Sequence, residues 1–542
     1  MIEARALDFW LLDNGFDSNP FASKEADFEV MGDQSRMVDY FVRAFWFEQI
    51  LGEARQPRSA ILSARRGFGK SASRLMVEYE CRHGRLAGQV LAVAYTNFER
   101  AIAAQHHSDN QAVQQAHMRS ITENCTLSLM NYLKEQPAQI ANLGYGGSYR
   151  LVALLAGYTN LFDPFQLDET LRQTNADEKV LNSQTFLEAA QTGSLTNLLD
   201  RANLGQERAW LELLGQAAIY NQPPPPLNLS LIYDFYRLAQ MVGLSAVYIL
   251  VDRVDELPET AANPAAGAEL LRPLLADLRL MEVPGLAFKF FLPNEISALL
   301  FASPEIRADR LTRYEIHWSE AQLVNFLHNR LLAYSSNSGL NSLAPFCETG
   351  FADEIDQELS GRAEGSPRNL LRLGELLINE HCQGADINGP LRRAEMEQAY
   401  QKLRGSLQEE QAAYNISPSS QLAFDQAALE QFPSQNHQTG LYLDNARRQV
   451  WREGNLIEPG PIGQEYTLLE YLYQNAGRAI SKDELLRAIY GNANYPEVSE
   501  EALAQMISRL RKKIEPAPKS GQTTYIITVP RFGYKLENRS RD

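Results

Sequence analysis

A short glycine-containing loop between a strand pattern and a helix pattern constrains the fold of this chain most. Residues 59–62 (SAIL) predict a β-strand, and apolar residues at helical spacing begin at Ala72. Between them runs ARRGFGKS, residues 64–71, and a second apolar strand pattern, QVLAVAYTNF, follows at 89–98. The order strand, loop, helix, strand predicts a parallel α/β sheet with the loop at the end of its first strand.

The loop has the residues of a phosphate-binding site, which needs converging backbone N–H groups, a cation and the positive end of a helix. Gly67 and Gly69 permit the required backbone, Lys70 would bridge the β- and γ-phosphates, and Ser71 would ligate Mg²⁺. Gly-Lys-Ser also occurs by chance, so the flanking strand and helix carry the interpretation. The residues expected around the nucleotide are Ala64, Arg65, Arg66, Gly67, Phe68, Gly69, Lys70, Ser71 and Ala72.

A second motif, VYILVDRVDEL, follows about 180 residues later. An apolar strand ends at Asp252, and two more acidic residues, Asp255 and Glu256, come directly after it. A carboxylate at the tip of a neighbouring strand can hold Mg²⁺ through water, and a second one can polarise an attacking water. We therefore expect Asp252 in the metal site and Asp255 or Glu256 in a catalytic role, with Glu256 favoured as the general base.

Together the two motifs resemble the ATPases of the AAA+ and STAND branches of P-loop proteins, and the resemblance covers residues 19–403. In such families the first glycine of the loop is often Ala or Ser, so Ala64 does not count against the site. The resemblance implies a P-loop ATPase fold with a helical insertion and a helical lid, ATP and Mg²⁺ as cofactors, and ATP hydrolysis.

Further positions fit the same family pattern. Asn294, in LPNEI after the strand pattern at 286–293, is the candidate polar sensor, and its alternative is an ordinary turn Asn. Arg368, in GSPRNLLRLGELL, resembles the lid arginine that reaches the γ-phosphate; its alternative is a plain helix start with Pro near its first position. An arginine finger for a neighbouring subunit could be Arg307, Arg310 or Arg313, although arginines near a loop are usually only solvated.

The C-terminal hundred residues follow a different pattern. Leu503, Met506, Ile507, Leu510 and Ile514 share one helix face. The opposite face is polar and basic, as a helix that reads the major groove of DNA requires. A solvated surface helix with basic residues near its C-terminus is the alternative.

The segments EYTLLEYL, NAGRAISKDELL, ISRLRKKI and TVPRFGYKL, in this order, resemble the winged-helix domain of OmpR/PhoB-type response regulators. The resemblance implies an α+β winged-helix fold and double-stranded DNA as the partner. Two features depart from the pattern: the helix opens with Glu500 and Glu501, and the wing has Pro530 and Arg531 where Arg and Gly are usual. The expected DNA contacts are Gln505, Ser508, Arg509, Arg511, Lys512 and Arg531.

Charge is distributed unevenly along the chain. Its 542 residues carry a formal charge of −16, whereas residues 440–542 hold 15 Lys and Arg against 13 Asp and Glu. The rest of the chain therefore carries −18, and only the C-terminal end suits a polyanion. Four scattered cysteines, no apolar run near 20 residues and no signal-peptide pattern lead us to expect a cytoplasmic protein without a membrane contact.

The chain is expected to divide into five parts. They are a lead-in at 1–57, an ATPase core at 58–317 with a helical insertion at about 100–222, a helical lid at 318–405, a linker at 406–438 and a winged-helix domain at 439–542. The function expected from this order is an ATP-controlled switch that regulates transcription, with homo-oligomers possible on ATP binding. The alternatives are a prokaryotic conflict or defence ATPase whose winged helix binds a partner protein, and a DNA-loading ATPase.

Overall fold

The computed structural model divides the chain into two compact units, Met1–Val42 with Ile50–Ser434 and Arg43–Gln49 with Gln435–Asp542. They are called the N-terminal and C-terminal units below, and each is described by itself. The structure describes residues 2–22, 36–105, 110–307, 309–336, 339–384, 387–415, 441–444, 449–452, 455–457, 464–494, 500–515, 525–530 and 532–537.

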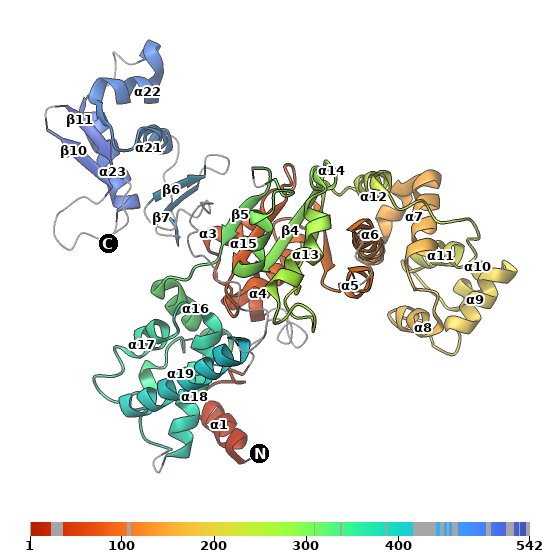
Figure 1. Ribbon diagram of the computed structural model, residues 1–542, viewed down its shortest axis with the longest axis horizontal. Helices are drawn as coiled ribbons and strands as arrows, with labels where there is room; N and C mark the ends of the chain where they lie inside the picture. Colours follow the sequence, from red (N-terminus) through yellow and green to blue (C-terminus); the bar gives the residue numbers. More distant parts are fainter. Residues whose placement is uncertain are drawn as a thin grey trace. The chain divides into compact units, whose positions relative to one another are not determined.

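The centre of the N-terminal unit is a five-stranded sheet in the order β2-β3-β4-β1-β5 (Figure 1). Every neighbouring pair of strands is parallel. The strands are β1 (Ala60–Ala64), β2 (Val90–Tyr95), β3 (Ala246–Val251), β4 (Leu286–Pro293) and β5 (Thr312–Glu315). The predicted parallel α/β sheet is therefore confirmed, and β4 lies between the strand that leads into the glycine loop and the strand that ends at Asp252.

Both faces of the sheet are covered, which explains the continuous apolar runs of β3 and β4. Alternate residues such as Ile249 and Phe288 belong to one large core with buried residues of the helices that follow β2, β3 and β4. The helix after the glycine loop is α4 (Lys70–Arg82). One charged side chain interrupts the apolar strands: Lys289 is buried, donates to the Arg58 carbonyl at 2.8 Å and lies 4.7 Å from the Tyr248 ring centroid.

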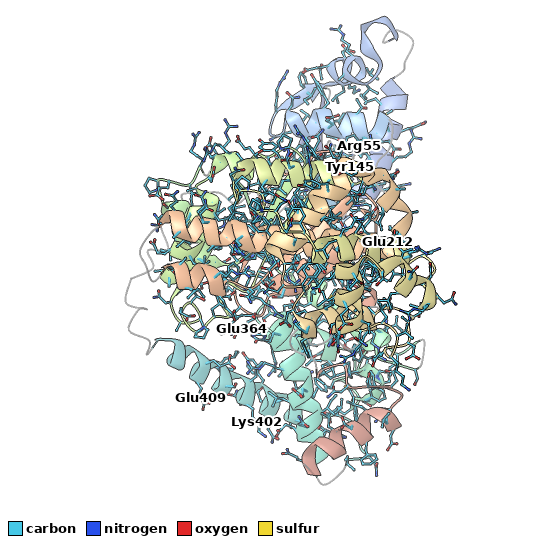
Figure 2. All side chains as sticks on the ribbon, turned by 90° about the vertical axis from the view of Figure 1, so that its right-hand side faces the viewer. Arg55, Tyr145, Glu212, Glu364, Lys402 and Glu409 are labelled. Atoms are coloured by element: carbon cyan, nitrogen blue, oxygen red, sulfur yellow. The ribbon has the colours of Figure 1, made fainter. Side chains whose placement is uncertain are left out.

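A long helical segment connects β2 to β3. It consists of α5 (Glu99–Gln105), α6 (Asn110–Glu135), η1 (Pro137–Leu143), α7 (Gly144–Tyr158), α8 (Pro164–Arg172), α9 (Ser183–Thr192), α10 (Leu195–Arg201), α11 (Arg208–Ala218) and α12 (Leu229–Met241). Helix α6 packs against β2 and α12 against β3, whereas α7 to α11 pack against α6, α12 and one another. The apolar core of the sheet continues into this segment. On the outside of the segment, Tyr145 of α7 is 90% exposed (Figure 2).

Three further helices accompany the last strands of the sheet: α13 (Pro264–Leu275), α14 (Leu278–Met281) and α15 (Asn294–Ala302). His117 of α6 ties the helical segment to this part of the molecule. Its Nδ1 lies 2.6 Å from the Tyr95 hydroxyl, and its Nε2 lies 2.8 Å from the Leu270 carbonyl of α13. Because a carbonyl only accepts, Nε2 carries the proton. Burial lowers the pKa of His117, so the imidazole is neutral and its Nδ1 accepts from the Tyr95 hydroxyl.

A helical lid follows the sheet, and the N-terminal helix packs against it. The lid contains α16 (Glu320–Ala333), η2 (Ala344–Phe346), α17 (Ile355–Arg362), α18 (Pro367–Gln383) and α19 (Arg393–Asn415), and α1 (Ile2–Asp13) packs on α18. Helix α3 (Phe45–Leu51) comes between α1 and β1 in the chain. Lys402 and Glu409 both lie on α19 (Figure 2).

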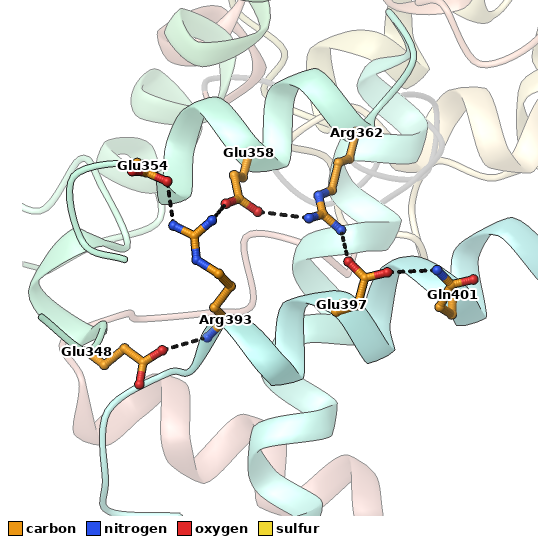
Figure 3. Close-up of polar contacts among 7 residues, drawn as sticks. All are labelled: Glu348, Glu354, Glu358, Arg362, Arg393, Glu397 and Gln401. Carbon is orange, nitrogen blue, oxygen red and sulfur yellow. Dashed lines mark hydrogen bonds and ion pairs between the residues drawn. The ribbon is translucent and has the colours of Figure 1, made fainter. Parts of the chain in front are cut away.

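Ion pairs join α17 to α19 across the lid surface (Figure 3). Arg362 lies 3.1 Å from Glu358 and 2.7 Å from Glu397, and Arg393 pairs with Glu354 and Glu358. These ion pairs add to the packing of α19, the last described helix of the N-terminal unit, against α18.

From residue 441 onward, the described residues of the C-terminal unit form two small antiparallel sheets and three helices. The sheets have the orders β6-β7-β8 and β10-β11-β9. The elements are β6 (Leu441–Asp444), β7 (Gln449–Arg452), β8 (Asn455–Leu456), α21 (Gln464–Gln474), β9 (Ala479–Ser481), α22 (Lys482–Asn494), α23 (Glu500–Ile514), β10 (Ile526–Val529) and β11 (Gly533–Leu536). Three helices followed by a terminal hairpin confirm the predicted winged-helix fold.

Within the described part of the chain, no helix combines the length and the apolar character that crossing a bilayer demands.

Candidate functional site

The glycine loop forms a tight turn between β1 and α4. Gly67 and Gly69 have φ angles of 85° and 96°, in the left-handed region that side chains with a Cβ rarely adopt. Gly69 is the N-cap of α4, so Lys70 is the first residue of this helix. The loop therefore leads directly to a helix N-terminus, where backbone N–H groups and the helix dipole favour an anion.

The start of lid helix α18 contacts this loop. The Arg368 backbone N–H and the Ser366 hydroxyl each donate to the Gly67 carbonyl at 3.3 Å. The Trp318 indole donates to the Phe68 carbonyl at 3.0 Å. The structure thus brings Arg368, which the sequence had singled out, to the loop on which Lys70 lies.

Two cations of α4 face two carboxylates that follow β3. Lys70 Nζ lies 3.9 Å from Asp255, and Arg74 Nε lies 3.1 Å from Asp252. Lys70 and Arg74 are one helical turn apart, so they occupy the same side of α4. Parallel strands β1 and β3 end at the same edge of the sheet, which is why the two motifs meet although about 180 residues separate them.

Glu256 does not share this arrangement. Its side chain is 51% exposed and pairs with Arg253 at 3.6 Å. Arg253 has a φ of 67°, so the backbone turns sharply after Asp252. After this turn Asp255 lies beside Lys70, whereas Glu256 lies beside Arg253.

Asp252 is the most deeply buried acidic group at the site, with 1% of its surface exposed. Burial raises the pKa of the Asp252 carboxyl above its usual value, while Arg74 and a hydrogen bond from Ser71 act in the opposite direction. Hydroxyl and carboxylate oxygens are the ligands that Mg²⁺ prefers. The hydrogen-bonded pair Ser71 and Asp252 therefore fits the metal that accompanies a nucleotide.

Asn294 follows β4 at the same edge and contacts a residue that sequence analysis missed. Its Nδ2 donates to Glu315 of β5 at 2.6 Å, and its buried Oδ1 has no hydrogen-bond partner among the described residues. Burial opposes the ionisation of Glu315, but hydrogen bonds from His317 and Asn294 lower its pKa below the usual value. The Asn294 side chain is thereby tied to β5 through its amide nitrogen.

The three candidate finger arginines lie in different environments. Arg313 of β5 is largely buried and donates to the Ser63 hydroxyl at 3.2 Å, so it is part of the sheet. Arg307 pairs with Asp309 at 2.9 Å and Arg310 with Glu282 at 3.6 Å. Arg307 and Arg310 also line a cavity of about 530 Å³ beside the amino ends of β1, β4 and β5.

Arg65 and Arg66 are exposed on the loop. The Arg372 guanidinium lowers the pKa of Glu410 on α19, and the charges of Arg368 and Arg66 act in the same direction. The far end of α19 therefore carries a carboxylate that interacts with both the loop and the lid arginine.

In the C-terminal unit, α23 has the two faces that its sequence predicts. Leu503, Met506, Ile507, Leu510 and Ile514 are all buried, which confirms the predicted apolar face. Gln505, Ser508, Arg509 and Lys512 are exposed.

Arg511 and Arg531 differ from the other expected DNA contacts. Arg511 donates to the Ile526 carbonyl at 2.8 Å and to the Thr528 hydroxyl at 2.8 Å, so it fastens α23 to the hairpin. Arg531 lies outside the described residues.

Sequence analysis missed Arg74, Glu315 and the contacts of Ser366 and Trp318. For Arg74 a signal was present, because it follows Lys70 by four residues and therefore lies on the same face of α4. The others depend on which strands and helices become neighbours, which the sequence pattern does not specify.

Comparisons with known proteins concern mainly the C-terminal unit. Residues 462–536 match the family described as "Transcriptional regulatory protein, C terminal". The probable transcriptional regulator ycf27 of Cyanophora paradoxa is 32% identical over 107 residues, covering 20% of this chain and 43% of that protein. Sensory transduction protein RegX3 of Mycobacterium tuberculosis is 38% identical over 74 residues, covering 14% of this chain and 31% of that protein. The match therefore spans less than half of either relative.

Two solved structures are also similar. The Klebsiella pneumoniae RstA DNA-binding domain in complex with the RstA box shares 27% identity, covers 18% of this chain and 93% of that chain, and has a TM-score of 0.16. The Aeropyrum pernix ORC1 protein in complex with DNA shares 12% identity, covers 92% and 90% of the two chains, and has a TM-score of 0.28. The family match alone identifies residues 462–536 as a transcription-regulator-type winged-helix domain of the OmpR/PhoB kind.

Proposed function

We propose that this protein is an ATP-binding and ATP-hydrolysing switch that controls DNA binding by its C-terminal winged helix. The main support for a nucleotide site is the pairing of Lys70 with Asp255 and of Arg74 with Asp252. Cations at the start of the helix after a glycine loop, opposite two carboxylates of a neighbouring strand, suit a nucleoside triphosphate with its metal. The resemblance of both motifs to AAA+ and STAND ATPases supports the same assignment.

The residues of the site have separate roles in this proposal. Lys70 leaves Asp255 for the β- and γ-phosphate oxygens, because a phosphate offers a denser negative charge than one carboxylate. Asp255, released from the ion pair, accepts the proton of the attacking water. Ser71 and Asp252 would hold the Mg²⁺ ion, which would supply charge neutralisation at the phosphates. Asn294, which follows β4 at the same edge of the sheet, would be the polar sensor.

The lid contacts provide a route from the nucleotide to the effector. Arg368 begins α18 beside the loop, and a phosphate bound there would compete with Glu410 of α19 for the charges of Arg368 and Arg66. Helix α19 is the last described helix before the linker to the C-terminal unit. Nucleotide binding would therefore change the position of α19, and hydrolysis would restore it.

DNA is the partner proposed for the C-terminal unit. The exposed side chains of Gln505 and Arg509 on α23 can reach base edges, and Lys512 can reach phosphates. Relatives of this domain include transcriptional regulators, and one similar domain was solved with its DNA site. The charge of the remaining chain, −18, disfavours DNA elsewhere, so binding would be confined to this unit.

ATP binding is tested with Lys70→Ala. Loss of the ammonium should lower ATP affinity at least about 100-fold, because it removes the only lysine charge at the loop. Fluorescent-nucleotide titration measures the affinity. The matched control is Lys402→Ala, an exposed lysine on α19, which should bind ATP as the unmodified chain does. Equal affinity in both variants would refute the nucleotide site.

The coupling to DNA is tested by gel shifts of the full chain on the DNA upstream of its own gene, with and without ATP. ATP should change the affinity for duplex in the unmodified chain and not in Lys70→Ala. Turnover of ATP without binding to any duplex would reject the regulator and favour a partner protein for the winged helix. Size analysis in ATP tests whether oligomers form, for which Arg307 and Arg310 are the exposed candidates.

A further inference from the structure

Arg74 has been given no separate role in the nucleotide site so far, although it contacts the proposed metal ligand Asp252. Its Nε lies 3.1 Å from Asp252, and both side chains are buried. A second nitrogen of the guanidinium lies 3.2 Å from Glu78, one turn further along α4. The guanidinium is therefore held in place from two sides.

A divalent cation that bound Asp252 would have to compete with this guanidinium. A buried carboxylate needs a compensating charge, and in the nucleotide-free protein Arg74 supplies it. Glu78 is paired with the same guanidinium, so the charges of Lys70, Arg74, Glu78, Asp252 and Asp255 sum to −1. A cation that bound the Asp252 carboxylate without a nucleotide would have to displace the Arg74 guanidinium from it, whereas the phosphates of ATP would supply further negative charge for the cations of the site.

We propose that Arg74 is a resident counter-ion that excludes free Mg²⁺ from the nucleotide-free site, so that the metal is accepted only together with the nucleotide. Arg74 is thus a positioning residue, since it acts through Asp252. The inference rests on the proposed function for the identity of the nucleotide. It adds an order of binding, because the metal cannot occupy the site before ATP does. Free cellular Mg²⁺ therefore does not bind the site of a protein without ATP.

The first test uses Mn²⁺ as a paramagnetic probe in the place of Mg²⁺. The unmodified chain in the absence of nucleotide should leave the electron paramagnetic resonance signal of free Mn²⁺ unchanged at concentrations up to about 100 μM, and ATP should make one ion bind. Tight binding of Mn²⁺ to the nucleotide-free chain would overturn the proposal without any variant.

The second test removes the counter-ion. Arg74→Gln should bind Mn²⁺ without nucleotide at least about tenfold more tightly than the unmodified chain, because Asp252 is left without its cation. Adding Asp252→Asn to this variant should abolish the gained binding, and Arg74→Lys should behave as the unmodified chain does. The matched control is Arg82→Gln, which removes an arginine two turns along the same helix, where it lies 4.0 Å from Glu78.

Failure of this inference is distinguishable from failure of the proposed function. ATP affinity is measured in parallel in EDTA, where no metal is present. If the unmodified chain binds no ATP, the nucleotide site is rejected. The Mn²⁺ titrations without nucleotide then still show whether Arg74 keeps a metal ion from Asp252. Normal ATP affinity with the same weak Mn²⁺ affinity in Arg74→Gln and Arg82→Gln would reject the role of Arg74 and retain the nucleotide site.

Discussion

Lys70 and Asp255 form an ion pair, which distinguishes Asp255 from its sequence neighbour Glu256. The 3.9 Å separation places Asp255 where the phosphates of a nucleotide would attract Lys70. Glu256, beside it in the sequence, pairs with Arg253 instead. Sequence alone left both carboxylates open and favoured Glu256, because the positive φ of Arg253 that separates them is invisible in a motif.

Asp255→Asn is therefore expected to lower the rate of ATP hydrolysis by about 10²-fold or more, since a general base typically contributes that much. ATP affinity should be unchanged or slightly higher, because Lys70 loses a competing partner. Single-turnover hydrolysis and nucleotide titration measure the two effects. Glu256→Gln is the control and should hydrolyse within about threefold of the unmodified chain. The opposite ranking of the two variants would return the catalytic role to Glu256.

The two glycines of the loop share a left-handed backbone but have different surroundings. A Cβ added at Gly67 would lie 3.1 Å from the Arg368 Cβ and 3.2 Å from the Ser366 hydroxyl, whereas one added at Gly69 would meet nothing within 4 Å. The first glycine therefore serves the contact with the lid as well as the turn, and the second serves the turn alone.

Both Gly67→Ala and Gly69→Ala should lose about 1 kcal/mol of unfolding free energy from backbone strain. Gly67→Ala should in addition separate α18 from the loop, so hydrogen exchange at Arg368 should rise in this variant only. Urea unfolding and hydrogen exchange by mass spectrometry measure the two quantities. Equal exchange at Arg368 in both variants would show that the lid does not depend on this close approach.

At the scale of elements, α6 and α13 are joined through a neutral histidine. Burial lowers the pKa of His117 to about 4, from an ordinary value near 6.5. The unfolded chain then binds more protons than the folded chain between these two pH values, so stability falls as the pH is lowered through 6.5 and stops falling near 4. Above pH 6.5 the imidazole is neutral in both states and contributes no pH dependence.

We expect the N-terminal unit to lose about 2 kcal/mol of unfolding free energy between pH 7 and pH 5 because of this residue. His117→Gln keeps a polar side chain near Tyr95 and Leu270 but cannot bind a proton, so the pH slope should become shallower by that amount. Urea unfolding at several pH values measures the slope. An unchanged slope in His117→Gln would assign the acid sensitivity to other groups.

The sequence predicted the helices and strands themselves better than it predicted which of them lie side by side. Continuous apolar runs indicated β3 and β4, and periodic apolar residues indicated α4 and α23, because burial on both faces or on one face leaves a direct pattern. The placement of β5 beside β1 left no such pattern. Glu315 and Arg313 could therefore not be assigned to the edge of the sheet beforehand, and the contact of Arg511 with the hairpin was equally hidden.

At the scale of the whole molecule, the chain combines a strongly acidic body with a nearly neutral winged helix. Residues 440–542 hold 15 basic against 13 acidic residues, and the rest of the chain carries −18. The described face of α23 presents two exposed cations, Arg509 and Lys512, and Arg509 also lies 3.5 Å from Glu465. Affinity for DNA should therefore depend on few phosphate contacts.

For the full chain in ATP, the logarithm of DNA affinity should fall with the logarithm of salt concentration with a slope of about −2 to −3. Lys512→Gln should make this slope less steep by about 1 on every duplex, and Arg509→Gln should mainly reduce discrimination between duplexes. Fluorescence anisotropy over a range of KCl concentrations measures both. A slope of about −8 would mean that residues beyond α23 contact the DNA.

The long connection between β2 and β3 has a consequence for how such a chain could be re-engineered or diversified. Helices α6 and α12 contact the sheet, whereas the principal contacts of the helices from α7 to α11 are with one another, with η1 and with α6 and α12. The outer helices are therefore attached to the sheet through α6 and α12. A chimera that exchanges α7 to α11 and retains α6 and α12 would keep these contacts with the sheet.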